Sequence, residues 1–369
     1  MLKYRPINRT KRKKYNIMER LQPENMKNSG SDKRNALKEL VMERIWQLGI
    51  HPNENLGQHF LIDQASINLL AQSVNPGNTV IEIGAGVGQL TEALAQRATK
   101  VISIEIDRRY EPVLTQITRQ YPNVEVIFKD ALALRFEDFI PRRREDAGVQ
   151  IVASLPFHIT EPFMHKIAGL PIENATLAVG ERLVYAIQAP NEESIAFGQL
   201  TLLAQTFFDT DVVAVIEKKK FYPVPRTDSA IIRLIPKEAH EFRSNRREFL
   251  LRRLFLTAKR SPLVKNALKE GLIEFAQVSE RGTLSKREYN HKQRRTVKAD
   301  LKRMAMDYNH FGAPQSGTPK PRETEERFLT QNQARAIIER MEIPDSVLDK
   351  PFQQLNNSEM GILSKALRE

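Results

Sequence analysis

The sequence predicts an α/β fold, in which a mostly parallel sheet covered by helices on both faces is followed by a smaller helical domain. Seven short runs rich in Val and Ile alternate with helical stretches between residues 80 and 235. After residue 240 the strand signal disappears, and apolar positions recur at helical spacing. The chain of 369 residues is 41% hydrophobic, which is enough to form a core of this size.

The individual elements follow from these runs. We expect strands at residues 80–83, 101–106, 124–128, 151–155, 175–179, 212–216 and 230–235. Helices are expected at residues 33–48, 89–98, 249–256, 263–272 and 334–341. Residues 309–324 contain two Gly and three Pro and predict a linker or loop. We therefore divide the chain into a basic arm and helix (1–50), an α/β domain (51–240) and a helical, basic domain (241–369).

Basic residues are concentrated in two segments. The formal net charge is +12; residues 1–50 carry 13 basic and 5 acidic side chains, and residues 241–304 carry 18 and 7. This asymmetry indicates a polyanionic partner such as nucleic acid, because each cation that neutralises a phosphate releases a counterion. A solvated surface that keeps the protein soluble is the alternative. Basic positions in the stretch 275–325, which has no other motif, include Lys286, Arg287, Lys292, Arg294, Arg295 and Lys298.

Several classes of protein are excluded by composition. The chain has no Cys, which excludes disulfides, thiolate nucleophiles and Cys-based zinc sites and fits a reducing compartment. We expect no metal. No uncharged apolar run approaches 18 residues, and the N-terminus lacks an apolar signal segment. A mitochondrial transit segment is disfavoured by Glu19 and Glu24, so we expect a cytoplasmic protein without a membrane partner.

A glycine loop, EIGAGVG at residues 82–88, lies between the first strand and the next helix. Glycines there let the backbone turn sharply and approach a nucleotide-like ligand. A dinucleotide fold and a structural turn are the alternatives. The dinucleotide spacing G-x-G-x-x-G is not kept, because the third glycine comes one residue early, at Gly88, and residue 89 is Gln.

Two carboxylates follow the next two strands. Glu105 ends the strand at residues 101–106, where it can accept hydrogen bonds from both ribose hydroxyls of a nucleoside. Asp130 follows the strand at residues 124–128, where it can bind an adenine amine; a helix cap or a turn is the alternative. Together with Glu82, three acids stand at the carboxyl ends of three consecutive strands, which favours a nucleoside site.

A second motif, SLPF at residues 154–157, follows the fourth strand. The proline ends the strand ladder and leaves Ser154 and the Leu155 carbonyl as hydrogen-bond acceptors beside an aromatic side chain. Methylation of an exocyclic amine requires such acceptors and a stacking ring. An ordinary proline turn with a core Phe is the alternative. Phe221 is placed to supply a second stacking face, and residues 57–61 (GQHFL) are placed to close over a cofactor.

Six motifs in order, GQHFLID, EIGAGVG, SIEID, KDA, SLPF and FYPVPRTDSAI, resemble the rRNA adenine N6-dimethyltransferases of the KsgA and Erm types. The resemblance covers roughly residues 55–240. It implies a Rossmann-like class I methyltransferase domain with a smaller C-terminal helical domain. It also implies S-adenosyl-L-methionine as the donor and an rRNA adenine as the acceptor. The implied partner is rRNA, a ribosomal subunit or an assembly intermediate, bound by a monomer.

The resemblance also implies a role for each matching residue. Gln58 and Leu61 would contact the methionine end of the donor, and Glu82, Gly84 and Gly86 would line it. Glu105 would hold the ribose and Asp130 the donor adenine, with Ile106, Ala131 and Ser154 also at the donor site. The catalytic set, at the target base, would be Ser154, Leu155, Pro156, Phe157 and Phe221. Ser154 stands where the family usually has Asn, although amino methyltransferases more widely use Asp, Asn or Ser there.

These observations leave several functions open. The leading hypothesis is an enzyme that adds one or two methyl groups to a flipped-out rRNA adenine. Within it, both housekeeping modification of the small subunit and modification of the large subunit with antibiotic resistance remain open. The alternatives are a non-enzymatic rRNA-binding, ribosome-assembly or transcription factor on the same fold, and a methyltransferase that acts on cytosine amines.

Overall fold

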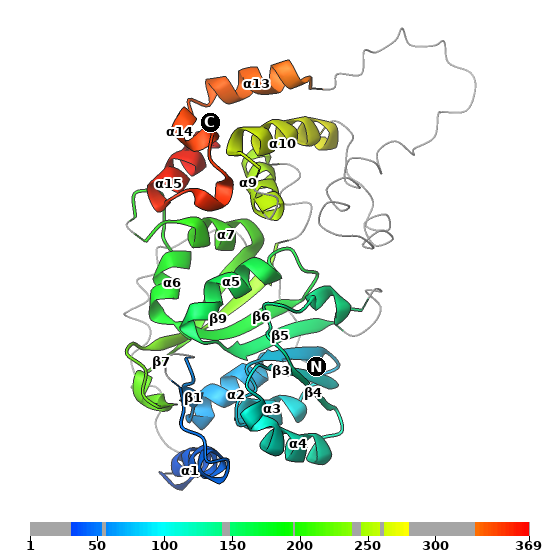
Figure 1. Cartoon of the computed structure of the whole chain (residues 1–369), viewed down its shortest axis with the longest axis vertical. Helices are drawn as coiled ribbons and strands as arrows, with labels where there is room; N and C mark the ends of the chain where they lie inside the picture. Colours follow the sequence, from blue (N-terminus) through cyan, green and yellow to red (C-terminus); the bar gives the residue numbers. More distant parts are fainter. Residues whose placement is uncertain are drawn as a thin grey trace, which may run out of the picture.

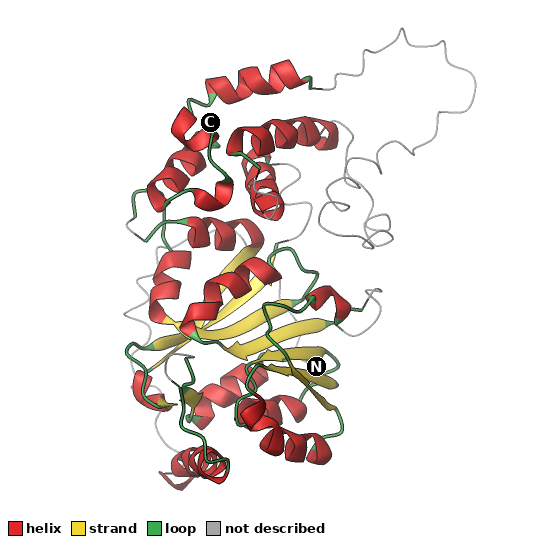
Figure 2. Ribbon diagram, viewed as in Figure 1, coloured by secondary structure: helices red, strands yellow, loops and turns green. Residues whose placement is uncertain are grey.

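The computed structural model describes residues 31–53, 57–141, 148–194, 196–237, 245–258, 262–279 and 329–368. Its centre is a seven-stranded sheet between two layers of helices, and a further group of helices lies at one end of the molecule (Figure 1). The expected α/β fold with a helical C-terminal region is therefore confirmed (Figure 2). The basic arm over residues 1–30 and the basic positions 286–298 lie outside the described residues.

The strands of the large sheet coincide with the seven expected runs. They are β2 (Thr79–Ile83), β3 (Lys100–Glu105), β4 (Val124–Phe128), β5 (Val149–Ser154), β6 (Asn174–Gly180), β7 (Phe208–Ile216) and β9 (Ser229–Pro236). Their order across the sheet is β4-β3-β2-β5-β6-β9-β7, with β9 antiparallel to its two neighbours and the others parallel. The strand order reverses at β2, so its carboxyl end is the crevice where open α/β sheets bind ligands.

Helices cover both faces of the sheet. One layer contains α1 (Ser31–Gln47), α2 (Gln64–Gln72), α3 (Gln89–Ala95) and α4 (Glu111–Gln120). The other contains α5 (Phe157–Ile167), α6 (Glu181–Ile187) and α7 (Gln199–Phe207). Neighbouring residues of β2 illustrate the arrangement: Val80 packs in the first layer and Ile81 in the second. This two-sided burial explains why the strands read as continuous apolar runs.

The C-terminal helices pack on the second layer. They are α9 (Arg246–Thr257), α10 (Val264–Ser279), α13 (Gln331–Arg340), α14 (Asp345–Leu348) and α15 (Asn357–Ala366). The ring of Phe255 lies between Phe207 of α7 and Phe352, with centroid distances of 5.9 and 4.9 Å. The domain boundary near residue 240 falls within residues 238–244, outside the described part, and stays a prediction. None of the described helices is long and apolar enough to cross a bilayer.

A small second sheet joins two distant segments. Strand β1 (Phe60–Leu61) pairs antiparallel with β8 (Phe221–Tyr222), so that Leu61 lies opposite Phe221. A Cβ atom built on Gly57 would lie 2.7 Å from the Pro156 Cβ, and one on Gly86 would lie 3.1 Å from the Phe60 ring. The segment 57–61 therefore crosses over the carboxyl ends of β2 and β5.

Candidate active site

The glycine loop turns tightly at the carboxyl end of β2. Gly84, Gly86 and Gly88 have φ angles of 80°, 54° and 83°, a region that side chains rarely adopt. A Cβ on Gly88 would lie 2.1 Å from the Ile117 Cδ1, so glycine lets α3 begin directly against α4. A Cβ on Gly84 would meet only the Ser154 carbonyl oxygen, at 4.0 Å. Open space therefore lies beside Gly84, between the loop and the end of β5.

Glu105, the last residue of β3, fixes the backbone of this loop. Its Oε2 accepts a hydrogen bond from the Gly86 N–H (2.8 Å), and its Oε1 accepts one from the Asp107 N–H (2.8 Å). Burial raises the pKa of the Glu105 carboxyl above its ordinary value, although the backbone hydrogen bonds oppose this. A carboxylate has about four lone-pair sites, so the Glu105 side chain can accept a further hydrogen bond from a hydroxyl donor.

Glu82 supports the loop from beneath. The side chain is completely buried, and its Oε2 accepts hydrogen bonds from the hydroxyls of Thr91 (2.6 Å) and Ser103. Burial raises the pKa of Glu82 to about 7, with the neighbouring Glu105 charge adding to the rise. Its Oε1 has no hydrogen-bond partner within the described residues. These contacts tie β2 to α3 and β3; direct contact between Glu82 and a donor stays a prediction.

Apolar and acidic side chains are exposed at the next two strand ends. Ile106, directly after β3, is 67% exposed, which is unusual for so apolar a side chain. Asp130 is exposed after β4, and its Oδ1 accepts a hydrogen bond from the Leu132 N–H (2.8 Å). This hydrogen bond forms the turn that the sequence analysis gave as the alternative role of Asp130. It uses only one of the two carboxylate oxygens. Ala131 is buried in the core.

The segment before β1 is anchored beside the loop by Gln58. Its Oε1 accepts from the Asn53 N–H (2.9 Å), and its Nε2 donates to the Asp107 Oδ2 (2.8 Å). The Leu61 side chain is buried in the core beneath the segment. Both residues thus hold the segment 57–61 in place, and their contact with a donor stays a prediction.

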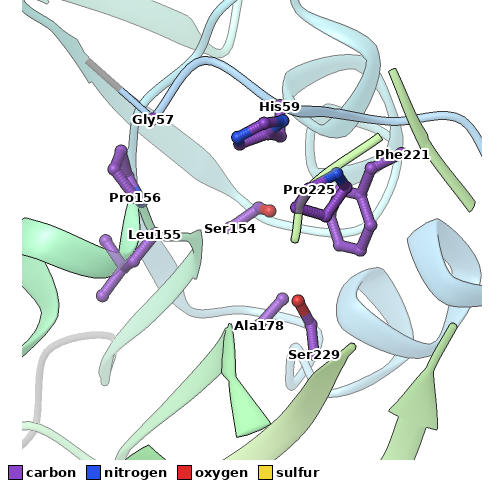
Figure 3. Close-up of a pocket in the computed structure, with 9 residues that line it drawn as sticks. All are labelled: Gly57, His59, Ser154, Leu155, Pro156, Ala178, Phe221, Pro225 and Ser229. Atoms are coloured by element: carbon purple, nitrogen blue, oxygen red, sulfur yellow. The ribbon is translucent and has the colours of Figure 1, made fainter. Parts of the chain in front are cut away.

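A narrow pocket lies between this segment and the end of β5; we call it the base pocket, after the target base that the sequence analysis expects at this place. Figure 3 shows the Ser154 hydroxyl pointing into it, with His59 on one side and Phe221 and Pro225 on another. The cavity volume is only about 20 Å³, roughly enough for one water molecule. Its lining comprises Gly57, His59, Ser154, Leu155, Pro156, Ala178, Phe221, Pro225 and Ser229.

The SLPF motif forms one wall of the base pocket. The Leu155 N–H donates to the Ala178 carbonyl oxygen (3.0 Å), which is the last sheet contact before the chain turns. Pro156 caps α5, and its carbonyl accepts from the Thr160 hydroxyl (3.0 Å). Phe157 is the first residue of α5, and its side chain lies outside the described part. Four of the five expected base-site residues, Ser154, Leu155, Pro156 and Phe221, therefore line one pocket.

Other lining residues were not assigned to the base site from the sequence. His59 donates from Nδ1 to the Pro223 carbonyl oxygen (2.8 Å), which fixes the ring at the edge of the pocket. Its place in the GQHFL motif was the available signal. Ala178 carried no signal, because it reaches the pocket only through the register that pairs it with Ser154. Ser229 begins β9 and lies within the FYPVPRTDSAI motif.

Comparisons with known proteins identify the family to which the chain belongs. Residues 50–298 match the family model described as ribosomal RNA adenine dimethylase. The "Ribosomal RNA small subunit methyltransferase A" of Alkaliphilus oremlandii is 32% identical over 187 residues, covering 49% of this chain and 64% of the relative. The protein of that name from Bacillus mycoides is 35% identical over 233 residues, covering 60% of this chain and 78% of the relative. The chain thus spans just under two thirds of the first relative and more of the second.

Two solved structures are similar to the chain. The 23S rRNA methyltransferase ErmE has 24% identity and a TM-score of 0.44, covering 68% of this chain and 98% of that chain. A dimethyladenosine transferase from Plasmodium falciparum has 22% identity and a TM-score of 0.44, covering 81% of this chain and 93% of that chain. The match of the family model to more than half of the chain confirms the resemblance seen in the motifs. The protein belongs to the ribosomal RNA adenine dimethylase family.

Proposed function

We propose that the protein transfers one or two methyl groups from S-adenosylmethionine to the N6 amine of an adenine in ribosomal RNA. The observation that carries this proposal is that the glycine loop and the SLPF motif lie next to each other in the fold. The space beside Gly84 of the glycine loop opens directly onto the Ser154 carbonyl of the SLPF motif. A donor in this space and a base in the base pocket would be near enough for direct transfer. Membership of the adenine dimethylase family supports the same reaction.

The residues around the glycine loop fit the chemistry of this donor. The Glu105 carboxylate would accept hydrogen bonds from the ribose hydroxyls, and the exposed Ile106 side chain would pack against the flat adenine ring. The Asp130 Oδ2 would accept from the adenine amine, while Oδ1 keeps its turn contact. When bound, the donor supplies a methyl group on a positively charged sulfur, which is open to direct attack by a neutral amine.

At the base pocket the protein's part is to position the amine. The Ser154 hydroxyl and the Leu155 carbonyl would accept the N6 hydrogens, so that the nitrogen lone pair is directed at the methyl group. Phe221 would stack on the base, and we propose Phe157 for the opposite face. Such positioning and hydrogen bonding contribute several kcal/mol without a general base. The proton can leave to solvent after the transfer.

The base pocket must widen before an adenine enters. Its volume of about 20 Å³ is far below the 300–1,000 Å³ of typical ligand sites. The wall most directly in the way is the segment 57–59, because Gly57 packs tightly against Pro156. We propose that this segment moves when the base binds, while its anchor through Gln58 keeps it over the donor.

The RNA partner is proposed from the relatives and from the charge. The similar curated proteins are named small-subunit methyltransferases, so we propose small-subunit rRNA, free or within a subunit or assembly intermediate. The basic segments 1–50 and 241–304 would grip its phosphates. We further propose that the protein acts as a monomer in the cytoplasm.

A non-enzymatic rRNA-binding factor is the second candidate. The observation in its favour is Ser154, whose hydroxyl reaches less far than the Asn amide that the family usually has there. On that alternative the protein binds rRNA without transferring methyl groups.

Mass spectrometry of rRNA tests the proposal. We expect N6-methylated adenine at a defined small-subunit position in cells with the gene, and its loss when the gene is deleted. A gene copy carrying Glu105→Ala is the matched control and should not restore the modification. Identical rRNA spectra with and without the gene, for both subunits, would favour the binding factor.

A further inference from the structure

A second, much larger cavity opens beside the base pocket. Its volume is about 670 Å³, within the usual range for a ligand site. It shares Gly57 and His59 with the base pocket, so the two cavities meet along the segment 57–59. We call it the flank pocket. It lies between the first turns of α5 and α6 and the loop that leads into β9.

Two exposed arginines line the flank pocket. Arg182 comes from the first turn of α6, and Arg226 comes from the loop before β9. Neither guanidinium has an ion pair or hydrogen bond to another part of the described chain. A guanidinium presents a planar set of donors that matches the oxygens of a phosphate. Two such groups in one cavity favour an anionic ligand with phosphate oxygens.

The remaining lining of the flank pocket contains both apolar and polar side chains. Leu183, Ala186 and Leu200 provide apolar surface, and Glu161 of α5 is the only acidic residue among the lining residues. A carboxylate would repel a second phosphate but would accept hydrogen bonds from an amine on the edge of a base. Two guanidinium groups for a phosphate, apolar surface for a sugar or base, and a carboxylate acceptor in one cavity together match a nucleotide.

We propose that the flank pocket holds the nucleotide adjoining the target adenine, and that Arg182 and Arg226 bind its phosphodiester. The proposal rests on the proposed function, because it takes the base pocket as the place of the target adenine. An RNA strand that delivers a base into that pocket must pass along its rim, and the flank pocket adjoins this rim at Gly57 and His59. An acidic peptide would have no such reason to lie beside the base pocket.

RNA binding by the full chain tests the flank pocket directly. The double variant Arg182→Ala/Arg226→Ala should bind unmodified small-subunit rRNA at least tenfold more weakly than wild type at moderate salt. The slope of log affinity against log salt should fall by about 1–2, since each lost phosphate contact contributes about 0.7–0.9. Arg119→Ala, which removes an exposed arginine of α4, is the matched control and should change neither quantity. Affinity for S-adenosylmethionine should be unchanged in both variants.

The two proposals fail in different ways. If the double variant matches wild type in rRNA affinity, salt slope and KM for RNA, the flank pocket does not hold the strand, even if methyl transfer is intact. If wild type binds rRNA but transfers no methyl group, the proposed function fails. The difference in rRNA affinity between wild type and the double variant then tests the flank pocket by itself. Arg182→Lys/Arg226→Lys keeps the charge and should restore the salt slope of wild type, whereas affinity should recover only in part because lysine lacks the planar donor set. A salt slope that stays at the alanine value would contradict phosphate binding, and unchanged urea unfolding of the alanine variant shows that it is folded.

Discussion

The proposed donor side and the proposed base side of the candidate site are built differently. On the donor side, Glu105 holds the glycine loop through two backbone N–H groups, and the buried Glu82 ties the loop's strand to its neighbours. On the base side, the Ser154 hydroxyl faces a cavity of about 20 Å³ whose cover, the segment 57–59, packs against Pro156. The donor side is thus shaped before any ligand arrives, whereas the base side must open.

This difference separates two kinds of sensitivity. Substitutions on the donor side break hydrogen bonds that already exist, so they should change both stability and donor affinity. Substitutions on the base side remove groups that act only when RNA is bound, so they should change turnover more than donor affinity. The following predictions, from the largest expected effect to the smallest, test this separation.

The largest effect is expected for Glu82→Gln. Since the folded pKa of Glu82 is raised from 4.5 to about 7, the stability that its protonated form provides is present at low pH and is lost as pH rises through about 7. One pKa unit corresponds to about 1.36 kcal/mol, so the shift is equivalent to roughly 3 kcal/mol. Between about pH 4.5 and pH 8, the free energy of unfolding of wild type in urea should fall by about this much relative to that of the glutamine variant, because glutamine does not titrate. If the free energy of unfolding changes with pH in the same way in both proteins, the raised pKa of Glu82 is wrong.

Arg44→Ala should have the next largest effect. Arg44 of α1 donates to the Val87 carbonyl of the glycine loop (2.9 Å) and makes two hydrogen bonds to Glu92 of α3 (2.8 and 3.0 Å). Hydrogen bonds to charged groups in a partly buried site contribute about 1.5–3 kcal/mol. We expect a loss of about 2 kcal/mol in the free energy of unfolding and a several-fold loss of donor affinity. Arg97→Ala, at an exposed arginine just after α3, serves as the control.

Glu105→Ala should weaken S-adenosylmethionine binding at least tenfold, or by about 1.4 kcal/mol. The ribose contacts are lost, and the Gly86 N–H loses its acceptor. Isothermal titration calorimetry on the folded variant measures this. Glu125→Ala removes an exposed glutamate of the neighbouring β4 and should leave the affinity as it is. Unchanged affinity in Glu105→Ala would remove Glu105 from the donor site.

Deletion of residues 1–30 should have a smaller, purely electrostatic effect. The arm is strongly basic, so its loss should lower rRNA affinity several-fold and flatten the salt dependence. Donor affinity should stay the same. Equal salt slopes with and without the arm would mean that it does not contact RNA.

Much of the donor side could be predicted from the sequence. The strands are buried on both faces and therefore read as plain apolar runs, and the glycines of the loop stand where the φ angles require them. Parallel strands bring their carboxyl ends to one edge, so Glu105 and Asp130 could be assigned to one site without a structure. Glu82 shows the limit, since its position in the motif did not reveal that its carboxylate is fully buried.

The base side could be predicted only in part from the sequence, because its arrangement depends on contacts between distant parts of the chain. The pairing of β1 with β8 brings Leu61 opposite Phe221, and no local pattern indicates which distant residues pair. His59 and Ala178 enter the base pocket only through such pairings. The two arginines of the flank pocket likewise come to line one cavity only after folding, because α6 and the loop before β9 are far apart in the sequence.

The most direct test of the account compares turnover with donor affinity in variants of the base pocket. Methyl incorporation would be measured on ribosomal particles from a strain lacking the enzyme, with donor affinity measured by calorimetry on the same preparations. We predict that wild type transfers methyl groups and that Ser154→Ala and Phe221→Leu lower turnover by a larger factor than they lower donor affinity. Ser154→Asn should preserve or raise turnover. Absence of transfer by wild type on naked rRNA, on either subunit and on assembly intermediates would contradict the account.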